Sequence, residues 1–238
     1  MTSNSAICLV IPLPLGSLPA RRTRHGHVRE ATHLGHCLRF MREASRHFDA
    51  VIVCAAETHH ADARSILATR EFREVQLVVA PDPGSRADCL RAGVAALPSR
   101  DTAVLVHDLS RPLASSGVRD RVLDALGAAH PQATSGLVVP ALVVVDSVKA
   151  IDGHGTVVGT IDRTCLRSVQ YPRGLSAALL REVLSHSPGP GALDEVAVAF
   201  ARGIPIVTVD GDPDGFKVSD SDQILTEAIL WCRLQGRR

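Results

Sequence analysis

Short runs of β-branched and other apolar residues alternate along the chain with longer segments in which apolar residues recur every three or four positions. The short runs predict strands, at Ala6–Ile11, Ala50–Cys54, Val75–Ala80, Ala103–Val106, Gly136–Val139 and Ile204–Val209. The longer segments predict amphipathic helices, at Arg29–Arg46, His60–Thr69, Arg86–Ala96, Val118–Ala128, Ala177–Leu184, Asp194–Ala201 and Asp222–Leu234. This alternation is typical of an α/β protein with a mainly parallel sheet wrapped by helices.

The region Val143–Gln170 breaks the alternation. Two extended runs, Val143–Ile151 and Thr156–Val158, flank the Gly-rich segment Asp152–Gly155. This pattern predicts a β-hairpin arm at about residues 143–170 that projects from the α/β body. Because such an arm has little core of its own, we expect it to pack on a second subunit. One domain, residues 1–238, with this arm is the simplest organisation.

Composition narrows the class of protein further. Of 238 residues, 45% are hydrophobic but only 3% are aromatic, so aliphatic side chains must build the core. The net charge of +1 argues against a nucleic-acid binder. The apolar runs are shorter than the roughly 18 residues that span a bilayer, and the six cysteines are scattered without a Cys-x-x-Cys pair. We therefore expect a cytoplasmic protein with reduced thiols that binds no membrane.

The clearest candidate for chemistry follows the apolar run Val104–Val106. Asp108 and Arg111 come directly after this predicted strand, where an open parallel sheet places its ligands. Asp108 offers an oxygen ligand for Mg²⁺, and the Arg111 guanidinium matches the geometry of a phosphate. The structural alternative is an aspartate that caps a turn beside a surface arginine.

Two further segments carry candidate residues. The turn Gly211–Ser219 presents Lys217, which is one of only two lysines in a chain that otherwise uses arginine. The loop that begins at Gly84 leads into a predicted helix, where backbone amides can face an anion or the edge of a base. A solvated lysine and an ordinary helix cap remain the alternatives for these two segments.

In their order and spacing, several segments together resemble the 2-C-methyl-D-erythritol 4-phosphate cytidylyltransferase family. The matching stretches are Arg86–Gly93, Val104–Pro112, Asp146–Lys149, Asp162–Arg163, Gln170–Pro172, Asp194–Glu195 and Gly211–Lys217. The resemblance implies a Rossmann-like nucleotidyltransferase fold and a homodimer joined by the arm. It also implies an enzyme that uses Mg²⁺ to join CTP to 2-C-methyl-D-erythritol 4-phosphate. The products would be 4-diphosphocytidyl-2-C-methyl-D-erythritol, an isoprenoid precursor of the non-mevalonate pathway, and pyrophosphate.

The resemblance also implies roles for individual residues. The nucleotide would contact Gly16, Gly84, Arg86, Cys89 and Asp108. The acceptor, a polyol phosphate, would contact Asp108, Arg111, Ser147, Arg163 and Lys217, and Asp108 would also bind the metal. The catalytic cations would be Arg22, Arg29, Arg163 and Lys217, with Arg163 reaching across the dimer.

The chain departs from the family pattern at its N-terminal loop. The family has a Gly-rich turn there, whereas the run from Pro12 to Arg22 keeps only Gly16 and contains several prolines, which lack an amide hydrogen. Residues 21–47 carry seven arginines against two glutamates. Among them, Arg22 and Arg29 best match the family's Arg and Lys, and a solvated helix face is the alternative reading of the basic stretch.

The acceptor side departs as well. Tyr171 and Leu193 stand where threonines are usual, and Arg173 replaces a glutamine. These departures keep two other functions open: transfer to a different polyol phosphate, and a catalytically impaired dimeric homologue that binds a nucleotide or a partner. The sequence lacks the Gly-x-Gly-x-x-Gly and Gly-x-Ser-x-Gly turns of dinucleotide-binding oxidoreductases and of α/β-hydrolases. The histidines between His25 and His36 have no thiol or carboxylate spacing that would support a metal site.

Overall fold

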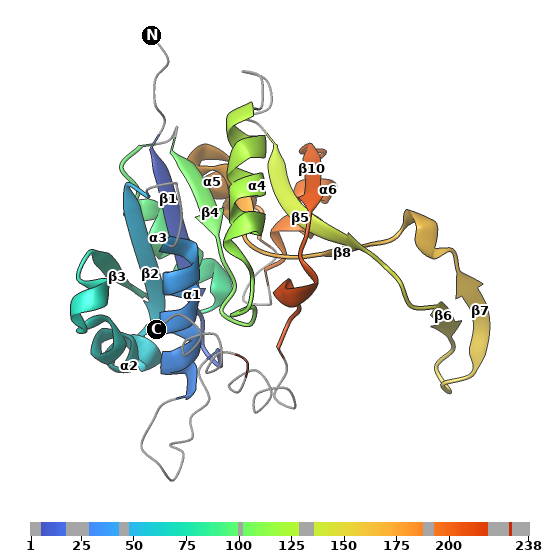
Figure 1. Ribbon diagram of the computed structural model, residues 1–238, viewed down its shortest axis with the longest axis horizontal. Helices are drawn as coiled ribbons and strands as arrows, with labels where there is room; N and C mark the ends of the chain where they lie inside the picture. Colours follow the sequence, from blue (N-terminus) through green and yellow to red (C-terminus); the bar gives the residue numbers. More distant parts are fainter. Residues whose placement is uncertain are drawn as a thin grey trace.

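A central sheet organises the chain in the computed structural model, which describes residues 6–17, 29–42, 48–99, 102–128, 136–187, 193–218 and 229. The order of the strands across the sheet is β10-β5-β9-β4-β1-β2-β3, and β8 pairs with β5 (Figure 1). Their bounds are β1 Ile7–Leu13, β2 Ala50–Ala56, β3 Val75–Ala80, β4 Ala103–Val106, β5 Leu137–Val143, β8 Arg167–Val169, β9 Arg173–Ser176 and β10 Ile206–Asp210.

The sheet is parallel except at two strands. Strands β3, β2, β1 and β4 are successive parallel neighbours, and β5 runs parallel to β10. Strand β9 lies antiparallel between β4 and β5, and β8 is antiparallel to β5. The parallel strands therefore end at a common edge, and the start of β9 lies at that same edge, beside the end of β4.

Helices cover both faces of the sheet because alternate strand residues point to opposite sides. Their bounds are α1 Arg29–Arg42, α2 Glu57–Leu67, α3 Arg86–Ala95, α4 Ser116–Ala128, α5 Ala177–Ser185 and α6 Glu195–Ala201, with 3-10 turns at Arg70–Phe72, Arg163–Cys165 and Pro213–Gly215. Strand β1 shows the alternation: Val10 packs on the side of α3 and α5, whereas Ile11 packs on the side of α1, α2 and α4. The core is accordingly two aliphatic layers, one on each face.

The expected α/β fold with a mainly parallel sheet is confirmed, and the predicted strands and helices between residues 50 and 201 are found with small shifts at their ends. The last four residues of the helix expected at Arg29–Arg46, and nearly all of that expected at Asp222–Leu234, lie outside the described residues. Sequence analysis missed β8 and β9. Both are short, and the Arg-Gly pair that opens β9 gives no apolar alternation.

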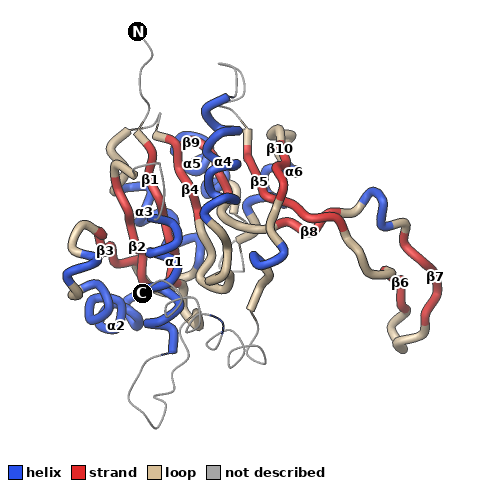
Figure 2. Tube along the Cα trace, in the orientation of Figure 1, coloured by secondary structure: helices blue, strands red, loops and turns tan. Residues whose placement is uncertain are grey.

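The expected hairpin is present. Strands β6 (Val148–Ile151) and β7 (Val157–Ile161) pair antiparallel as a separate two-stranded sheet. In Figures 1 and 2 this hairpin extends well away from the central sheet, on a stem formed where β8 pairs with the end of β5. No helix of the described residues therefore covers the hairpin.

A membrane-spanning helix is not found among the helices that the structure describes, because none of them combines the length and the apolar character that crossing would need.

Close packing between α3 and the sheet predicts that alanine substitutions at two helical glycines differ in their effect on stability. A Cβ at Gly93 would lie 2.5 Å from Cys54 Sγ and 3.0 Å from Val10 Cγ1. Gly93→Ala should lower the free energy of unfolding by about 1–3 kcal/mol through overpacking. The matched control is Gly127→Ala in α4, where a Cβ would meet no atom within 4 Å. It should be neutral or raise stability by up to about 1 kcal/mol. Urea unfolding of both variants measures the difference, and equal effects would contradict it.

Candidate active site

The loop that enters α3 brings the chain to the carboxyl ends of the parallel strands. Ser85 caps this helix: its Oγ accepts a hydrogen bond from Asp88 N, and Asp88 Oδ2 accepts one from Ser85 N at 3.0 Å. Gly84 has a φ of +68°, and a Cβ there would lie 2.5 Å from Ala56 Cβ, so only glycine fits. Leu15 N donates to Gly84 O at 2.8 Å, which joins the N-terminal loop to this one.

Asp108 follows the end of β4 with its two carboxylate oxygens in different surroundings. Oδ1 accepts hydrogen bonds from Ser110 N at 2.9 Å and from Ser110 Oγ at 2.8 Å. Oδ2 faces Arg86 Nη1 at 3.8 Å, beyond hydrogen-bonding distance. Burial alone would raise the pKa of Asp108, but the Arg86 charge and the Ser110 hydrogen bonds outweigh it and lower the pKa. The carboxylate is therefore ionised and holds one oxygen available to a ligand.

The turn that carries Lys217 is attached to the same region. Val218 N donates to Ser110 O at 2.8 Å, and Arg111 Nη1 donates to Gly215 O. The Gln170 amide binds the turn through Asp212: its Nε2 donates to Asp212 O at 2.8 Å, and its Oε1 accepts from Asp212 N at 2.9 Å. The Lys217 side chain is exposed. Backbone contacts thus fix the position of the lysine without using its ammonium group.

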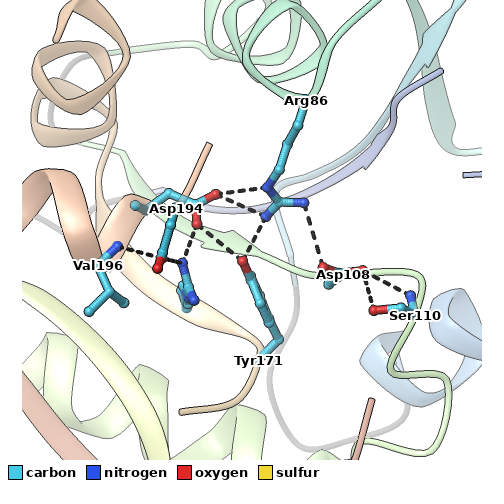
Figure 3. Close-up of polar contacts among 8 residues, drawn as sticks. Arg86, Asp108, Ser110, Tyr171, Asp194 and Val196 are labelled. Atoms are coloured by element: carbon cyan, nitrogen blue, oxygen red, sulfur yellow. Dashed lines mark hydrogen bonds and ion pairs between the residues drawn. The ribbon is translucent and has the colours of Figure 1, made fainter. Parts of the chain in front are cut away.

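A buried carboxylate, Glu195, joins the α3 loop to β9. It is wholly buried at the start of α6, and its Oε1 accepts hydrogen bonds from Arg86 Nε at 3.1 Å and from Arg86 Nη2 at 2.9 Å. Its Oε2 accepts one from Tyr171 Oη at 3.1 Å and another from Arg173 Nη1. Arg173 Nη1 also donates to Asp194 Oδ1 at 2.9 Å. Figure 3 shows the contacts of Arg86 with Tyr171 and Asp108, with Asp194 close by.

Tyr171 lies at the centre of this arrangement. The guanidinium carbons of Arg173, Arg86 and Arg111 lie 4.3, 5.3 and 6.0 Å from the centre of its ring. These distances fit cation–π contacts. Its hydroxyl also accepts a hydrogen bond from Arg86 Nη2 at 3.1 Å. Burial, the largest influence, raises the pKa of the phenol.

The structure thus brings together Gly84, Arg86, Asp108, Arg111 and the turn of Lys217, which the sequence predicted as parts of one site. Gly16 adopts a φ of +82° with open space around its Cα. Cys89 is different: its thiol is buried in the core beneath the loop, and burial raises its pKa to about 11. A side-chain contact between Cys89 and a base stays a prediction.

Other predicted residues are not brought to Asp108. Arg22 lies outside the described residues, and of Arg29 only the backbone, as the first residue of α1, is described. Ser147 and Arg163 are exposed on the arm, where Arg163 Nη1 donates to Val145 O. Since the arm extends away from the sheet (Figure 1), these two side chains do not meet Asp108 of their own chain.

Sequence reasoning gave no role to Glu195 or to Gln170. The available signal for Glu195 was the pair of departures at Tyr171 and Arg173, two residues apart, because both side chains contact its Oε2. A buried carboxylate needs such partners. The third departure, Leu193, is simply buried in the apolar core.

The chain is similar in sequence to known proteins over most of its length. A sequence model described as "IspD: 2-C-methyl-D-erythritol 4-phosphate cytidylyltransferase" matches residues 23–231. A 2-C-methyl-D-erythritol 4-phosphate cytidylyltransferase from Nocardia farcinica is 40% identical over 146 residues, which are 61% of this chain and 60% of that protein. One from Roseobacter denitrificans is 35% identical over 189 residues, 75% of this chain and 81% of that protein.

The fold is shared with solved structures. A crystal structure of 2-C-methyl-D-erythritol 4-phosphate cytidylyltransferase from Thermus thermophilus has a TM-score of 0.68 and 27% sequence identity. The alignment covers 94% of this chain and 98% of that one. The expected nucleotidyltransferase-like fold is therefore confirmed over nearly the whole chain.

Because Tyr171 is the only tyrosine in the sequence, its ionisation can be followed in isolation. An ordinary phenol titrates at a pKa of 10.0, and the pKa of Tyr171 is raised in the folded protein. Above pH 10 the unfolded chain therefore loses this proton while the folded chain keeps it, so stability should fall as the pH rises further. Ultraviolet absorbance of the phenolate, recorded beside circular dichroism, measures this. A phenolate that forms near pH 10 while the protein is still folded would contradict the described environment.

Proposed function

Because the chain belongs to the 2-C-methyl-D-erythritol 4-phosphate cytidylyltransferase family, we propose that it transfers a cytidylyl group from CTP to 2-C-methyl-D-erythritol 4-phosphate. The products are 4-diphosphocytidyl-2-C-methyl-D-erythritol, which serves isoprenoid synthesis, and pyrophosphate. The observation that supports this proposal best is the convergence of the Arg86 loop, Asp108 with Arg111, and the Lys217 turn at one edge of the sheet. These three segments are far apart in the sequence but adjacent in space.

The reaction requires a phosphate oxygen of the acceptor to attack the α-phosphorus of CTP, with pyrophosphate as the leaving group. A protein accelerates such a step mainly by positioning the reactants and by stabilising negative charge in the transition state. In this proposal Gly16, Gly84 and Arg86 lie along the nucleotide, Cys89 packs beneath their loop, and Arg22 and Arg29 bind the nucleotide phosphates. Lys217, whose side chain is exposed, holds the attacking phosphate.

Arg111 contributes on the acceptor side. Its guanidinium donates to Val169 O at 3.2 Å and to Gly215 O, and burial lowers its pKa without neutralising it. These hydrogen bonds fix Arg111 beneath the Lys217 turn, so its charge adds to that of the lysine. Asp108, whose Oδ2 lies 3.8 Å from Arg86 Nη1, orients the acceptor.

Asp108 is also the residue that fits a bound Mg²⁺. Among the described residues no group of three His, Cys, Asp or Glu side chains is arranged to hold a metal by itself. Mg²⁺ is, however, commonly bound by one or two carboxylates together with substrate phosphates, and Asp108 keeps Oδ2 free of hydrogen bonds from Ser110. When bound there, Mg²⁺ would supply charge neutralisation for the triphosphate.

The arm supplies the remaining acceptor contacts in a homodimer. Six of its large apolar side chains are exposed, namely Val143, Val145, Ile151, Val157, Val158 and Ile161. Such a patch favours burial against a second subunit. Docking of the arm would carry Arg163 and Ser147 to the Asp108 site of the other chain, which their own chain does not allow. The buried free thiols of Cys8, Cys37, Cys54 and Cys89 support a cytoplasmic setting for this enzyme.

Pyrophosphate release with CTP, Mg²⁺ and 2-C-methyl-D-erythritol 4-phosphate tests the function directly. We expect turnover of about 1 per second or faster. Lys217→Ala should lower it about 100-fold or more, because a cation that stabilises the reacting phosphate is lost. The matched control is Arg202→Ala, which removes an exposed cation just after α6, outside the arm and the Lys217 turn. This variant should keep most of the activity.

The outcomes separate the competing functions. Release with a different polyol phosphate, and none with 2-C-methyl-D-erythritol 4-phosphate, would replace the acceptor but keep the reaction class. No release with any acceptor would contradict an enzymatic role and favour a binding protein. Equal activity of Lys217→Ala and the unmodified protein would remove Lys217 from the mechanism.

A site that combines the body of one subunit with the arm of the other predicts that two inactive variants complement each other. Arg163→Ala removes the contribution of the arm, and Lys217→Ala removes that of the body. After the subunits are mixed and exchanged, a mixed dimer has one site with Lys217 and Arg163 both intact. Pyrophosphate release should then exceed that of either variant alone. If mixing restores no activity while exchange is complete, Arg163 does not act across the dimer.

Dimer formation is tested in parallel by light scattering. Val158→Asp on the arm should shift the protein from two copies to one, because burying the new charge is costly. The control is Phe200→Asp, which changes an apolar side chain on α6, outside the arm, that is even more exposed than Val158. It should leave the dimer intact.

A further inference from the structure

The Arg86 guanidinium has two sides with different surroundings. Its Nε and Nη2 both donate to Glu195 Oε1, and Nη2 also donates to Tyr171 Oη. Its Nη1 makes no hydrogen bond within the described part of the chain and lies 3.8 Å from Asp108 Oδ2. One edge of the guanidinium is therefore fully used inside the protein, and the other edge points toward the candidate active site.

The Tyr171 hydroxyl contacts both Arg86 and Glu195, the two groups whose pairing sets the orientation of the Arg86 guanidinium. It accepts from Arg86 Nη2 at 3.1 Å and donates to Glu195 Oε2 at 3.1 Å. Tyr171 Oη gives Arg86 Nη2 a second acceptor besides Glu195 Oε1, and each added hydrogen bond restricts the orientation of the guanidinium further. The hydroxyl thus holds Arg86 and Glu195 in one relative geometry.

Arg173 makes this arrangement possible in a buried site. Glu195 is wholly buried, and a buried carboxylate is stable only when its charge is paired and its oxygens are hydrogen-bonded. Arg173 Nη1 supplies the second cation at Oε2, and its guanidinium lies 4.3 Å from the centre of the Tyr171 ring. Arg173 therefore fixes both Glu195 and the ring that carries the hydroxyl.

We propose that Tyr171, acting through the buried carboxylate of Glu195, is a positioning residue that orients the Arg86 guanidinium toward the bound nucleotide. This inference rests on the proposed function, because it takes the nucleotide to be the ligand of Nη1. Tyr171 itself need not touch the nucleotide, since both of its hydroxyl contacts are to protein groups. The nucleotide, rather than the acceptor, should be the substrate whose binding depends on this hydroxyl.

Tyr171→Phe tests the inference with the smallest change. The ring and its cation–π contacts remain, and only the hydroxyl is lost. The dissociation constant for CTP, measured by calorimetry, should rise about tenfold, as expected for a lost hydrogen bond to charged groups. The KM for CTP should rise with it, whereas the KM for the acceptor should stay unchanged.

Non-additivity distinguishes positioning from a merely structural effect. If the hydroxyl acts through Arg86, then Tyr171→Phe should have little further effect on CTP binding once Arg86→Lys is present. The matched control is Arg91→Lys on the same helix, whose Nη1 pairs with Asp88 Oδ1 at 3.0 Å. In that background the effect of Tyr171→Phe should be undiminished. Glu195→Gln provides a second cycle, provided that circular dichroism shows it folded.

The outcomes distinguish a failure of the proposed function from a failure of the inference about Tyr171. If the unmodified protein binds no CTP, the proposed function fails, and the role of Tyr171 toward the nucleotide fails with it. If it binds CTP and the folded Tyr171→Phe variant binds equally well, the function stands and the inference is overturned. Additive effects of Tyr171→Phe and Arg86→Lys would also overturn it. A selective, non-additive loss of CTP affinity supports it.

Discussion

A single buried carboxylate, that of Glu195, determines how the candidate site is assembled. A charge in that position must be paired and hydrogen-bonded, and removing one partner of such a pair costs about 3–5 kcal/mol. Glu195 begins α6, and its partners come from two other parts of the fold: Arg86 from the start of α3, and Tyr171 and Arg173 from around the start of β9. Because these contacts must form together, the loop after β3 is held against β9, and Arg86 is brought to the end of β4.

The antiparallel strand β9 is what makes this arrangement geometrically possible. Parallel strands deliver their carboxyl ends to one edge of the sheet, so Asp108 arrives there at the end of β4. An antiparallel neighbour instead delivers its amino end, and β9 thus places Tyr171 and Arg173 beside Asp108 from the opposite chain direction. Gln170, just before them, fixes the turn of Lys217 through Asp212. One reversed strand therefore serves both sides of the site.

Much of the fold was predictable because aliphatic periodicity is strong in β1, β2, β3 and β4, and in the helices that cover them. Strand β9 was missed because its residues are suited to contacts that are distant in sequence and not to an apolar alternation along the strand. Gly174 is an example, since a Cβ there would lie 2.6 Å from Val122 Cγ1 of α4. Asp108, Arg111 and Lys217 were predictable from strand ends, turns and the family resemblance. Glu195 was not, since nothing local marks a carboxylate as buried. Its cationic partners, Arg86 and Arg173, are more than 20 residues away in sequence.

The departures from the family pattern become intelligible in terms of these contacts. Tyr171 and Arg173 replace smaller polar residues, but they contact each other and both bind Glu195. The Tyr171 ring packs against the Arg173 guanidinium, and Arg173 is the second cation beside the Glu195 carboxylate. Leu193 joins the core instead. None of the three changes uses the free oxygen of Asp108 or the ammonium group of Lys217. The altered residues thus lie in the layer that supports the candidate site, while Asp108 and Lys217 keep the charges that the proposed phosphoryl chemistry needs.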